Sequence, residues 1–307
     1  MAARRPVVLT IVGPTGVGKT AVALALGRLC PVTVISADAR QVYRSLDIGT
    51  AKPTAEERRQ VPHLGLDLVD PGERYSAGLF TRAAAAWLSG VDGNRRPIVV
   101  GGTGFYVRAI ADGLFREPPM DPARRERLRD WTGRHEGLGR WAARLDPHYG
   151  GGGRQRAARA VEVALLTGQP LSWWQAHAPA ERVMRPWYVR LTLPRAALDR
   201  RIRERVDRML GSGLIDEVRA LLARGVPAGA PGLDAVGYRE VVAHVRGELA
   251  GADLPVAIAA STRRYAKRQQ TWFRHQLLGA PVVSLDAGEA PDALARQIAD
   301  LWETRGS

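Results

Sequence analysis

The sequence predicts an α/β fold in which a parallel sheet with flanking helices is interrupted by a helical insert. Short apolar runs alternate with helical patterns through the first third of the chain, as is typical of parallel strands joined by crossover helices. A glycine-rich loop joins the first apolar run to the first helical pattern. A proline-rich break at residues 116–122 then opens a charged helical region, and strand character returns only at Trp187.

The elements of the core follow from the spacing of apolar residues. We expect strands at Val7–Val12 and 33–36, with a crossover helix over Lys19–Leu29 between them. Ser76 can cap a helix that has one apolar face at the 3, 4, 7 spacing. That face consists of Leu79, Phe80, Ala83, Ala84, Trp87 and Leu88. Residues 97–104 form a further buried strand that runs into a glycine turn.

The insert and the C-terminal region are predicted to be mostly helical. A glycine run at residues 150–153 precedes a helix that begins at Arg154. A strand at 187–194 rejoins the sheet, and further helices, a long basic helix over about 257–278, a short strand at 282–285 and a terminal helix follow. We therefore expect a core formed by residues 1–115 and 187–307, and a helical insert at 116–186.

The charge of the chain favours a polyanionic partner such as nucleic acid. The formal net charge is +14, and 42 of the 45 basic residues are arginine. A bias in genome composition exchanges lysine for arginine but does not create an excess of cations over acids. The three remaining lysines are Lys19, Lys52 and Lys267. We expect Lys19 to contact phosphate, because a compact ammonium and a planar guanidinium are not interchangeable at a tight phosphate site.

Targeting and cysteine usage indicate a soluble, cytoplasmic protein. No run of 18 apolar residues and no signal-peptide pattern occurs, so no membrane is expected among the partners. The single cysteine, Cys30, cannot form an internal disulfide, and we expect a small buried side chain at a helix end. His63 is expected to be a hydrogen-bonded residue near the core.

The most specific motif is GPTGVGKT, which lies between the first strand and the first helix. Backbone N–H groups of such a loop approach phosphate oxygens, the lysine neutralises their charge and the threonine hydroxyl can bind Mg²⁺. The predicted diphosphate or nucleotide site therefore consists of Gly13, Pro14, Thr15, Gly16, Val17, Gly18, Lys19 and Thr20. This motif gives the fold a P-loop NTPase-like character, but the loop alone does not distinguish a nucleoside triphosphate from another diphosphate.

An acid after the second strand is the first candidate for chemistry. An ordinary ATPase or GTPase has a Mg²⁺-holding aspartate at the end of a strand, whereas residues 97–104 end in glycines and threonine. Asp38 should lie near the phosphate loop, because neighbouring parallel strands end at one edge of the sheet. It can bind Mg²⁺, act as a general base, or bond its own backbone in a turn.

Several motifs together resemble a known family. GPTGVGKT, SADARQVYRSLDIGTAKPT, PHLGLDLVDP, VVGGTGFYVRAIADGL, RIRERVDRML, AVGYRE and AKRQQTWFR occur in the order found in tRNA dimethylallyltransferases, also called tRNA isopentenyltransferases. The resemblance extends from Val7 to Arg274, and DIGTAKP and VGGTGFY are far more specific than a phosphate loop.

The resemblance implies a reaction. In that family the loop holds dimethylallyl diphosphate, and the prenyl group passes to the exocyclic amine of the adenosine directly 3′ of the anticodon, which yields N6-isopentenyladenosine and diphosphate. The catalytic aspartate of the family matches Asp38, and its diphosphate-binding arginine matches Arg205. Thr103 matches a position that contacts the reacting centre. Lys19, Thr20 and Mg²⁺ would absorb the charge of the departing diphosphate.

The resemblance also implies contacts with the anticodon stem-loop of tRNA and, by analogy, a monomer. The matching segments are Asp38, Ala39, Arg40 and Gln41; Arg154, Gln155, Arg156, Ala157 and Ala158; and Ala235, Val236, Gly237, Tyr238, Arg239 and Glu240. The family often has Asn-Asp before the second segment, where this chain has Gly152 and Gly153. On the long basic helix Arg264, Lys267 and Arg274 share one face, which is either a solvated face or a track for RNA.

Two other classes of function remain open from the sequence. A small-molecule kinase, or an adenylate prenyltransferase acting on free nucleotide, shares the phosphate loop and Asp38 but needs neither the insert nor the positive charge. An RNA-binding protein that uses nucleotide as a switch needs the basic surfaces but not Asp38.

Overall fold

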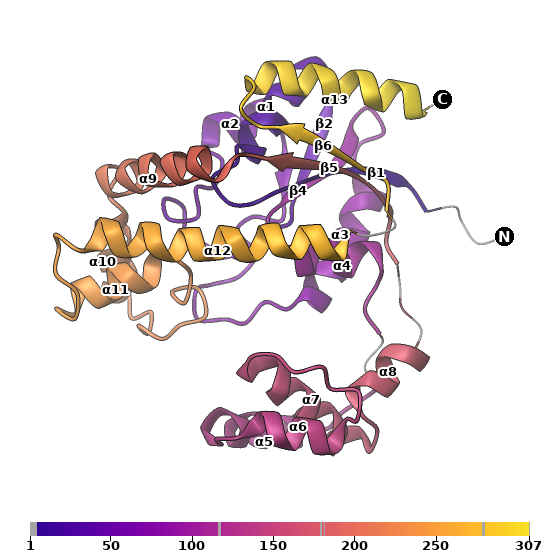
Figure 1. Ribbon diagram of the computed structural model, residues 1–307, viewed down its shortest axis with the longest axis vertical. Coiled ribbons are helices and arrows are strands. Elements are labelled where there is room, and N and C mark those ends of the chain that lie inside the picture. The colour runs from indigo at the N-terminus through magenta and orange to yellow at the C-terminus, as the bar shows by residue number, and fades with distance from the viewer. Residues whose placement is uncertain (1–4, 116–117, 179, 181, 278–279, 307) are drawn as a thin grey trace. The chain divides into compact units, whose positions relative to one another are not determined.

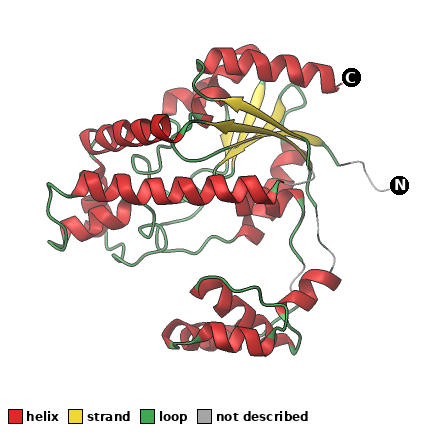
Figure 2. Cartoon of the chain, viewed as in Figure 1, coloured by secondary structure: helices red, strands yellow, loops and turns green. Residues whose placement is uncertain are grey.

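The computed structural model describes residues 5–115, 118–178, 180, 182–277 and 280–306. The chain divides into two units, and each is described by itself. Unit 1 consists of residues 1–111 and 183–307, and unit 2 consists of residues 112–182. The divisions fall four residues before each end of the insert expected at 116–186. Figure 1 traces the chain through both units, and Figure 2 separates its helices from its strands.

Unit 1 contains a six-stranded, wholly parallel sheet in the order β3-β2-β4-β1-β5-β6. The strands are β1 (Val7–Val12), β2 (Val32–Ser36), β3 (His63–Leu64), β4 (Arg96–Gly101), β5 (Arg185–Thr192) and β6 (Val282–Asp286). Together with the helices on both sides of the sheet (Figure 2), this confirms the predicted α/β class. The short strand β3 was not predicted, because two residues give too little pattern to recognise.

The helices of unit 1 pack on this sheet or on one another (Figure 1). They are α1 (Lys19–Leu29), α2 (Ala55–Gln60), α3 (Ala77–Gly90), α4 (Gly104–Ala111), α9 (Arg195–Gly211), α10 (Leu214–Ala223), α11 (Tyr238–Val245), α12 (Leu254–Gln276) and α13 (Pro291–Gly306). β1 and α1 have the predicted bounds. The Ser76 hydroxyl accepts the N–H of Leu79 and caps α3 as predicted.

Two side chains differ from the sequence prediction. On α3, Phe80 and Ala84 are buried, but Leu79 is 39% exposed, so the buried face is narrower than the spacing implies. Cys30, at the end of α1, is half-buried rather than buried, and its thiol donates to the Leu26 carbonyl. His63 has the expected role, because it is half-buried and its Nδ1 lies 2.7 Å from the Val61 carbonyl oxygen.

Unit 2 is helical, with a small core of its own. Its helices are α5 (Pro122–Arg134), α6 (Leu138–Leu145), α7 (Arg154–Thr167) and α8 (Leu171–His177). The buried side chains of this core are Leu138, Ala142, Ala157, Ala160 and Val161. The carboxylate of Glu162, itself 9% exposed, pairs with Arg125 at 2.5 Å and Arg159 at 3.1 Å. Across the described parts of both units, every helix is too short or too polar to span a membrane.

Candidate active site

Three strands bring the predicted site residues to one edge of the sheet. β4 lies between β1 and β2, and the register aligns Val12 with Gly101 and Ser36 with Val100. The phosphate loop follows β1, Asp38 follows β2 and Thr103 follows β4. Because parallel strands end at the same edge, residues that are far apart in the sequence lie next to one another here.

The phosphate loop has the backbone that its glycines permit. Gly18 is the N-cap of α1 and has φ +103°, a conformation that residues with a side chain rarely adopt. Because glycine has no side chain, no capping side chain bonds to the first N–H groups of α1. These groups and the helix dipole favour an anion at this point. The backbone of the loop is therefore compatible with the predicted phosphate site.

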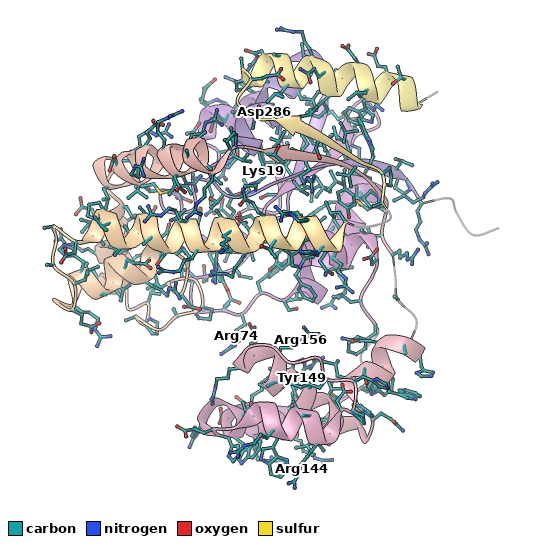
Figure 3. All side chains as sticks on the ribbon, viewed as in Figure 1. Lys19, Arg74, Arg144, Tyr149, Arg156 and Asp286 are labelled. Atoms are coloured by element: carbon teal, nitrogen blue, oxygen red, sulfur yellow. The ribbon has the colours of Figure 1, made fainter. Side chains whose placement is uncertain are left out.

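Lys19 extends back over the loop. Its ammonium donates to the carbonyl oxygens of Gly13 and Pro14, at 2.9 Å each. Burial lowers the pKa of Lys19 to about 8, an effect that the negative charge of Asp38 opposes and the positive charge of Arg205 reinforces. Figure 3 labels Lys19 within unit 1. An ammonium in this setting gains from a nearby phosphate, which replaces part of the lost solvation.

Asp38 uses one carboxylate oxygen to shape its own turn. Oδ1 accepts the N–H of Arg40 at 2.8 Å. Within the part of the chain that the structure describes, no protein donor bonds to the second oxygen, Oδ2. The turn and the general-base interpretations of Asp38 are thus compatible, since one oxygen fixes the carboxylate and the other remains open to a substrate proton.

Thr103 links the turn after β4 to the segment that holds Asp38. Its hydroxyl accepts the N–H of Ala39 at 2.9 Å, and its own N–H donates to the Ala37 carbonyl at 3.2 Å. Tyr265 of α12 forms a side-chain hydrogen bond with Thr103. Burial raises the pKa of Tyr265 to about 12, and the charge of Asp38 adds to the effect. Tyr265 therefore stays protonated beside Asp38 at neutral pH.

Arg205 brings a second cation to the same edge from α9. Its Nη2 donates to the Thr50 carbonyl in a long bond of 3.4 Å. Burial lowers the pKa of Arg205, whereas the charge of Asp38 raises it. The structure thus groups Lys19, Arg205 and Asp38 within electrostatic range of one another, which is the arrangement expected for a site that takes a polyanion and a proton.

Two positioning residues were missed in the sequence. Gln269 of α12 is 6% exposed; its Oε1 accepts the N–H of Thr15 at 2.8 Å, and its Nε2 donates to the Gly102 carbonyl at 2.8 Å. Arg201, one turn before Arg205, donates to the carbonyls of Val17 and Ala287 at 3.1 and 2.9 Å. A signal was present only for Arg201, which lies four residues before the predicted Arg205 on one face of α9. No local pattern marked Gln269, because its partners are far away in the sequence.

Comparisons with known proteins identify the family. A family model described as IPP transferase matches residues 41–276, and one described as isopentenyl transferase matches residues 6–69. A tRNA dimethylallyltransferase from Geobacter metallireducens is 43% identical over 275 residues, which cover 85% of this chain and 87% of that protein. The chain belongs to the tRNA dimethylallyltransferase family. The resemblance seen in the motifs is therefore confirmed.

Solved structures agree with this membership. The tRNA isopentenylpyrophosphate transferase from Bacillus halodurans is 32% identical, with a TM-score of 0.71, and the match covers 98% of this chain and 96% of that one. A eukaryotic dimethylallyltransferase acting on tRNA has a TM-score of 0.81 over 96% of this chain and 77% of that one. At 24% identity, this second likeness concerns the fold alone.

The segments that this member of the tRNA dimethylallyltransferase family is expected to use for tRNA contacts differ in their exposure to solvent. Arg264, Lys267 and Arg274 are all exposed on α12. Gln155 and Arg156 are exposed at the start of α7, whereas Ala157 is buried in the core of unit 2. Arg154 is exposed, but its Nη2 donates to the carbonyls of Thr132 and Gly133 at 2.7 Å each, at the end of α5. Gly153 caps α7 without a side chain.

The third segment is mostly buried. Ala235 is 2% exposed, and Tyr238 is fully buried and donates to Glu217 at 2.5 Å. In the same segment Arg239 is exposed, while Val236 and Glu240 are half-buried. In this conformation the side chains of Ala235 and Tyr238 therefore offer no surface to RNA, and Arg239 is the most exposed side chain of the segment.

The presence of a lysine at position 52 is explained by hydrogen bonds within the protein and not by contact with a phosphate. Its side chain is 1% exposed, and its ammonium donates to the Tyr43 carbonyl at 2.5 Å, to Asp47 at 2.7 Å and to Asp67 at 2.6 Å. A single nitrogen fits three convergent oxygens, whereas a forked guanidinium does not. This requirement explains why a chain so rich in arginine keeps a lysine here.

Proposed function

We propose that this chain transfers the dimethylallyl group from dimethylallyl diphosphate to the exocyclic amine of the adenosine directly 3′ of the anticodon in tRNA, with release of diphosphate. The observation that carries this proposal is the grouping of Asp38 with Lys19 and Arg205 beside the phosphate loop. The phosphate loop and the two cations can bind a diphosphate, and the open oxygen of Asp38 can accept the proton of an amine. Membership of the tRNA dimethylallyltransferase family supports the same reaction.

Asp38 acts as the general base. The adenine nitrogen forms a bond to the first carbon of the prenyl group while the bond from that carbon to the diphosphate oxygen breaks. The proton of the amine passes to Oδ2 of Asp38, and the bonding electron pair leaves with the diphosphate. Oδ1 stays bonded to the Arg40 N–H, so the carboxylate keeps its orientation during transfer. Thr103, fixed to Ala39, lies beside the reacting atoms.

The leaving diphosphate is stabilised by preorganised charge. Lys19 neutralises oxygens held by the loop N–H groups, and Arg205 adds a second cation from α9. Gln269 and Arg201 hold the loop backbone at Thr15 and Val17, so the donors need little rearrangement when charge develops. This positioning is the contribution of the protein to the departure of diphosphate.

A magnesium ion fits the donors that are present. The Thr20 hydroxyl stands at the start of α1 next to Lys19, and Mg²⁺ takes few protein ligands because substrate phosphates and waters complete its shell. Among the residues that the structure describes, no three His, Cys, Asp or Glu side chains form a metal cluster. Thr20 and the diphosphate would hold the ion, which would neutralise charge on the leaving group.

Each unit, taken by itself, offers exposed cations that we propose as contacts for tRNA phosphates. Unit 1 has Arg264, Lys267 and Arg274 on α12 and Arg239 in the first turn of α11, and unit 2 has Arg156 on α7. Their contacts with phosphates would supply affinity without reading sequence. The monomeric state expected from the sequence stays a prediction.

One assay separates this function from the alternatives. The protein is incubated with dimethylallyl diphosphate and Mg²⁺ in the presence of an unmodified tRNA transcript, free adenylate and ATP, and the digested tRNA nucleosides and the free nucleotides are analysed by mass spectrometry. We expect a prenyl mass on one adenosine, and its absence would refute the proposal. Prenylation of free adenylate instead of tRNA would favour the adenylate prenyltransferase, whereas consumption of ATP alone would favour a kinase.

A further inference from the structure

Unit 2 carries an exposed cluster of aromatic rings, here called the aromatic platform, formed by Trp131, His135 and Trp141. The rings of Trp131 and His135 are stacked, with centroids 4.3 Å apart and planes at 19°. Trp141 of α6 meets both rings edge-on, at 6.1 and 6.4 Å. Trp131 is 37% exposed and Trp141 is 40% exposed. Large apolar rings are normally covered, so a grouped and exposed set indicates a binding surface.

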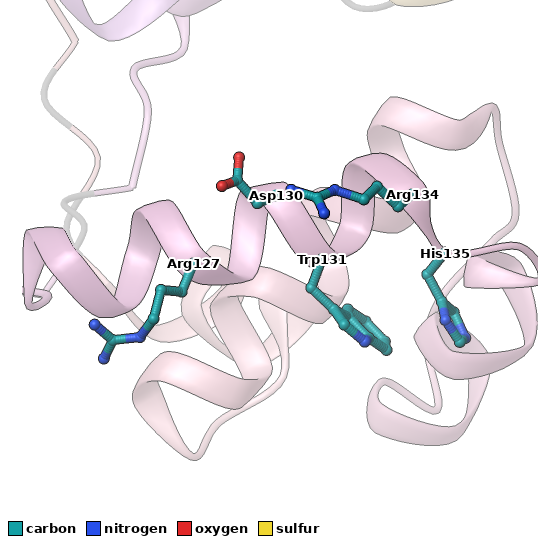
Figure 4. Close-up of a pocket in the computed structure, with 5 residues that line it drawn as sticks. All are labelled: Arg127, Asp130, Trp131, Arg134 and His135. Carbon is teal, nitrogen blue, oxygen red and sulfur yellow. The ribbon is translucent and has the colours of Figure 1, made fainter.

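Arginines border the platform. Arg127, Asp130, Trp131, Arg134 and His135 line an open depression of about 400 Å³ on α5. Figure 4 shows Arg127 and Trp131, four residues apart, projecting from one side of α5, with His135 directly after the end of the helix. Arg127 and Arg134 are exposed, and neither has an acid partner within the described residues.

The local charge indicates what this surface binds. Residues 122–145, which include α5 and α6, contain seven arginines and three acids. Aromatic rings beside unpaired guanidinium groups match single-stranded nucleic acid, because every base has a π-face and every nucleotide has a phosphate. Two other classes of partner fit less well. An acidic protein would pair with the arginines but would leave the stacked rings unexplained, and an apolar partner would leave the arginines unexplained.

We propose that the aromatic platform stacks an unpaired nucleobase of tRNA, while Arg127 and Arg134 hold the phosphates beside it. The proposal rests on the proposed function in that it takes tRNA as the substrate, and it adds a base contact to an insert otherwise expected to hold phosphates. Stacking of this kind contributes affinity without reading sequence, since all four bases stack. The platform therefore distinguishes looped RNA from uniform duplex.

Unit 2 also contains a matched control. Trp173 of α8 is 38% exposed and stacks on His177 with centroids 4.7 Å apart. The geometry is close to that of Trp131 and His135, but α8 contains no arginine. A general effect of removing an exposed tryptophan should appear at both positions, whereas a base contact should appear only at Trp131.

The test measures binding by the full-length protein of two probes: an unmodified tRNA transcript and a blunt RNA duplex without unpaired bases. We expect Trp131→Ala to weaken tRNA binding about 5- to 150-fold, the effect of losing one stacked base, and to leave duplex binding unchanged. Trp131→Phe, which keeps a ring, should restore most of the affinity, and Trp173→Ala should bind both probes like the parent protein. Trp141→Ala, at the outer ring, is a second variant if Trp131→Ala does not fold.

Salt dependence separates stacking from charge. The slope of log K against log salt should be unchanged in Trp131→Ala, and its magnitude should fall by about 0.7 in Arg127→Ala, which removes one phosphate contact beside an unpaired base. Equal losses in Trp131→Ala and Trp173→Ala, or an equal loss on duplex and tRNA, would overturn the proposal. So would unchanged tRNA binding together with loss of self-association in sedimentation, which would make the platform a contact between copies. If the prenyl-transfer assay failed but the variants showed the predicted pattern of tRNA binding, the proposed function would be refuted and the proposal for the aromatic platform would still hold.

Discussion

The side chain of Gln269 is hydrogen-bonded at both ends, to the N–H of Thr15 in the phosphate loop and to the Gly102 carbonyl after β4. These bonds join the basic helix α12 directly to the phosphate loop and to the turn after β4. Gly102 also needs its small size here, because a Cβ at that position would collide with the Gln269 amide. Gln269 is therefore a point at which α12 and the proposed diphosphate site meet.

Replacement of Gln269 tests this connection. Gln269→Leu keeps the volume but leaves two backbone groups without partners, so we expect a loss of about 1–3 kcal/mol in unfolding free energy for each buried group. We also expect the KM for dimethylallyl diphosphate to rise by about tenfold, equivalent to 1.4 kcal/mol of binding. Urea unfolding and steady-state kinetics provide the two measurements.

Gln269→Glu is a contrasting variant, because it keeps the acceptor for Thr15 but loses the donor to Gly102 and adds a negative charge beside the phosphate loop. It should raise the KM at least as much as Gln269→Leu, because the added charge repels a diphosphate. If Gln269→Leu changed stability alone and left KM unaltered, Gln269 would be a packing residue rather than a positioning residue of the loop.

Asp38→Asn is predicted to abolish base catalysis while leaving the turn in place. The amide oxygen of asparagine can still accept the Arg40 N–H, which Oδ1 accepts at 2.8 Å in the parent protein. We expect turnover to fall by about 100-fold or more, as for the loss of a general base, with tRNA affinity near normal. Single-turnover prenyl transfer and tRNA binding are measured on the same preparation.

Asp38→Ala serves as the comparison, because it removes both the base and the turn acceptor. A weaker tRNA complex in Asp38→Ala but not in Asp38→Asn would assign the difference to the turn. Unchanged turnover in Asp38→Asn would show that another group takes the proton.

The parts of the molecule that the sequence predicted depend on short-range signals. The bounds of β1 and α1 and the Ser76 cap follow from neighbouring residues, since a cap, a glycine loop or an apolar run is complete within a few positions. That Asp38 lies near the phosphate loop of Lys19 was also predictable, because parallel strands end at a common edge. The family resemblance supplied Thr103 and Arg205.

The parts that were missed depend on tertiary packing. Gln269 meets Thr15 across 254 residues, and no local pattern marks that pairing. The exposure of Leu79 and the burial of Tyr238 are set by which elements lie against them, not by their own spacing. Lys52 could be marked as unusual in an arginine-rich chain, but only the fold shows that its partners are Asp47 and Asp67.

Lys19 should make diphosphate binding depend on pH. Burial lowers its pKa in the free protein to about 8, and a bound diphosphate raises that pKa because it favours the ammonium. Below pH 8 the ammonium is already formed, so affinity should be level. Above pH 8 binding must take up a proton, so affinity should fall as pH rises. Isothermal titration of diphosphate from pH 6.5 to 9.5 measures this.

Lys19→Met should bind diphosphate weakly and without this dependence. The same linkage has the opposite sign in unfolding: between pH 8 and the unfolded value of 10.5 the folded state binds fewer protons, so the contribution of Lys19 to stability rises with pH. A flat affinity profile in the parent protein would contradict the lowered pKa.

Lys52 is predicted to support the fold and not the chemistry. Lys52→Met removes three hydrogen bonds, but Asp67 keeps its ion pair with Arg58 at 2.7 Å and Asp47 is 58% exposed. We therefore expect a loss of about 1–3 kcal/mol in unfolding free energy, below the 3–5 kcal/mol typical when a buried charge is left alone. Urea unfolding measures the loss.

Lys52→Arg keeps the charge and tests the geometry. We expect it to destabilise the protein as well, because a guanidinium cannot place one nitrogen among the oxygens of Tyr43, Asp47 and Asp67. The KM for dimethylallyl diphosphate should change by less than about twofold in both variants, since Lys52 is buried against protein oxygens. A raised KM with unchanged stability would instead assign Lys52 to the diphosphate.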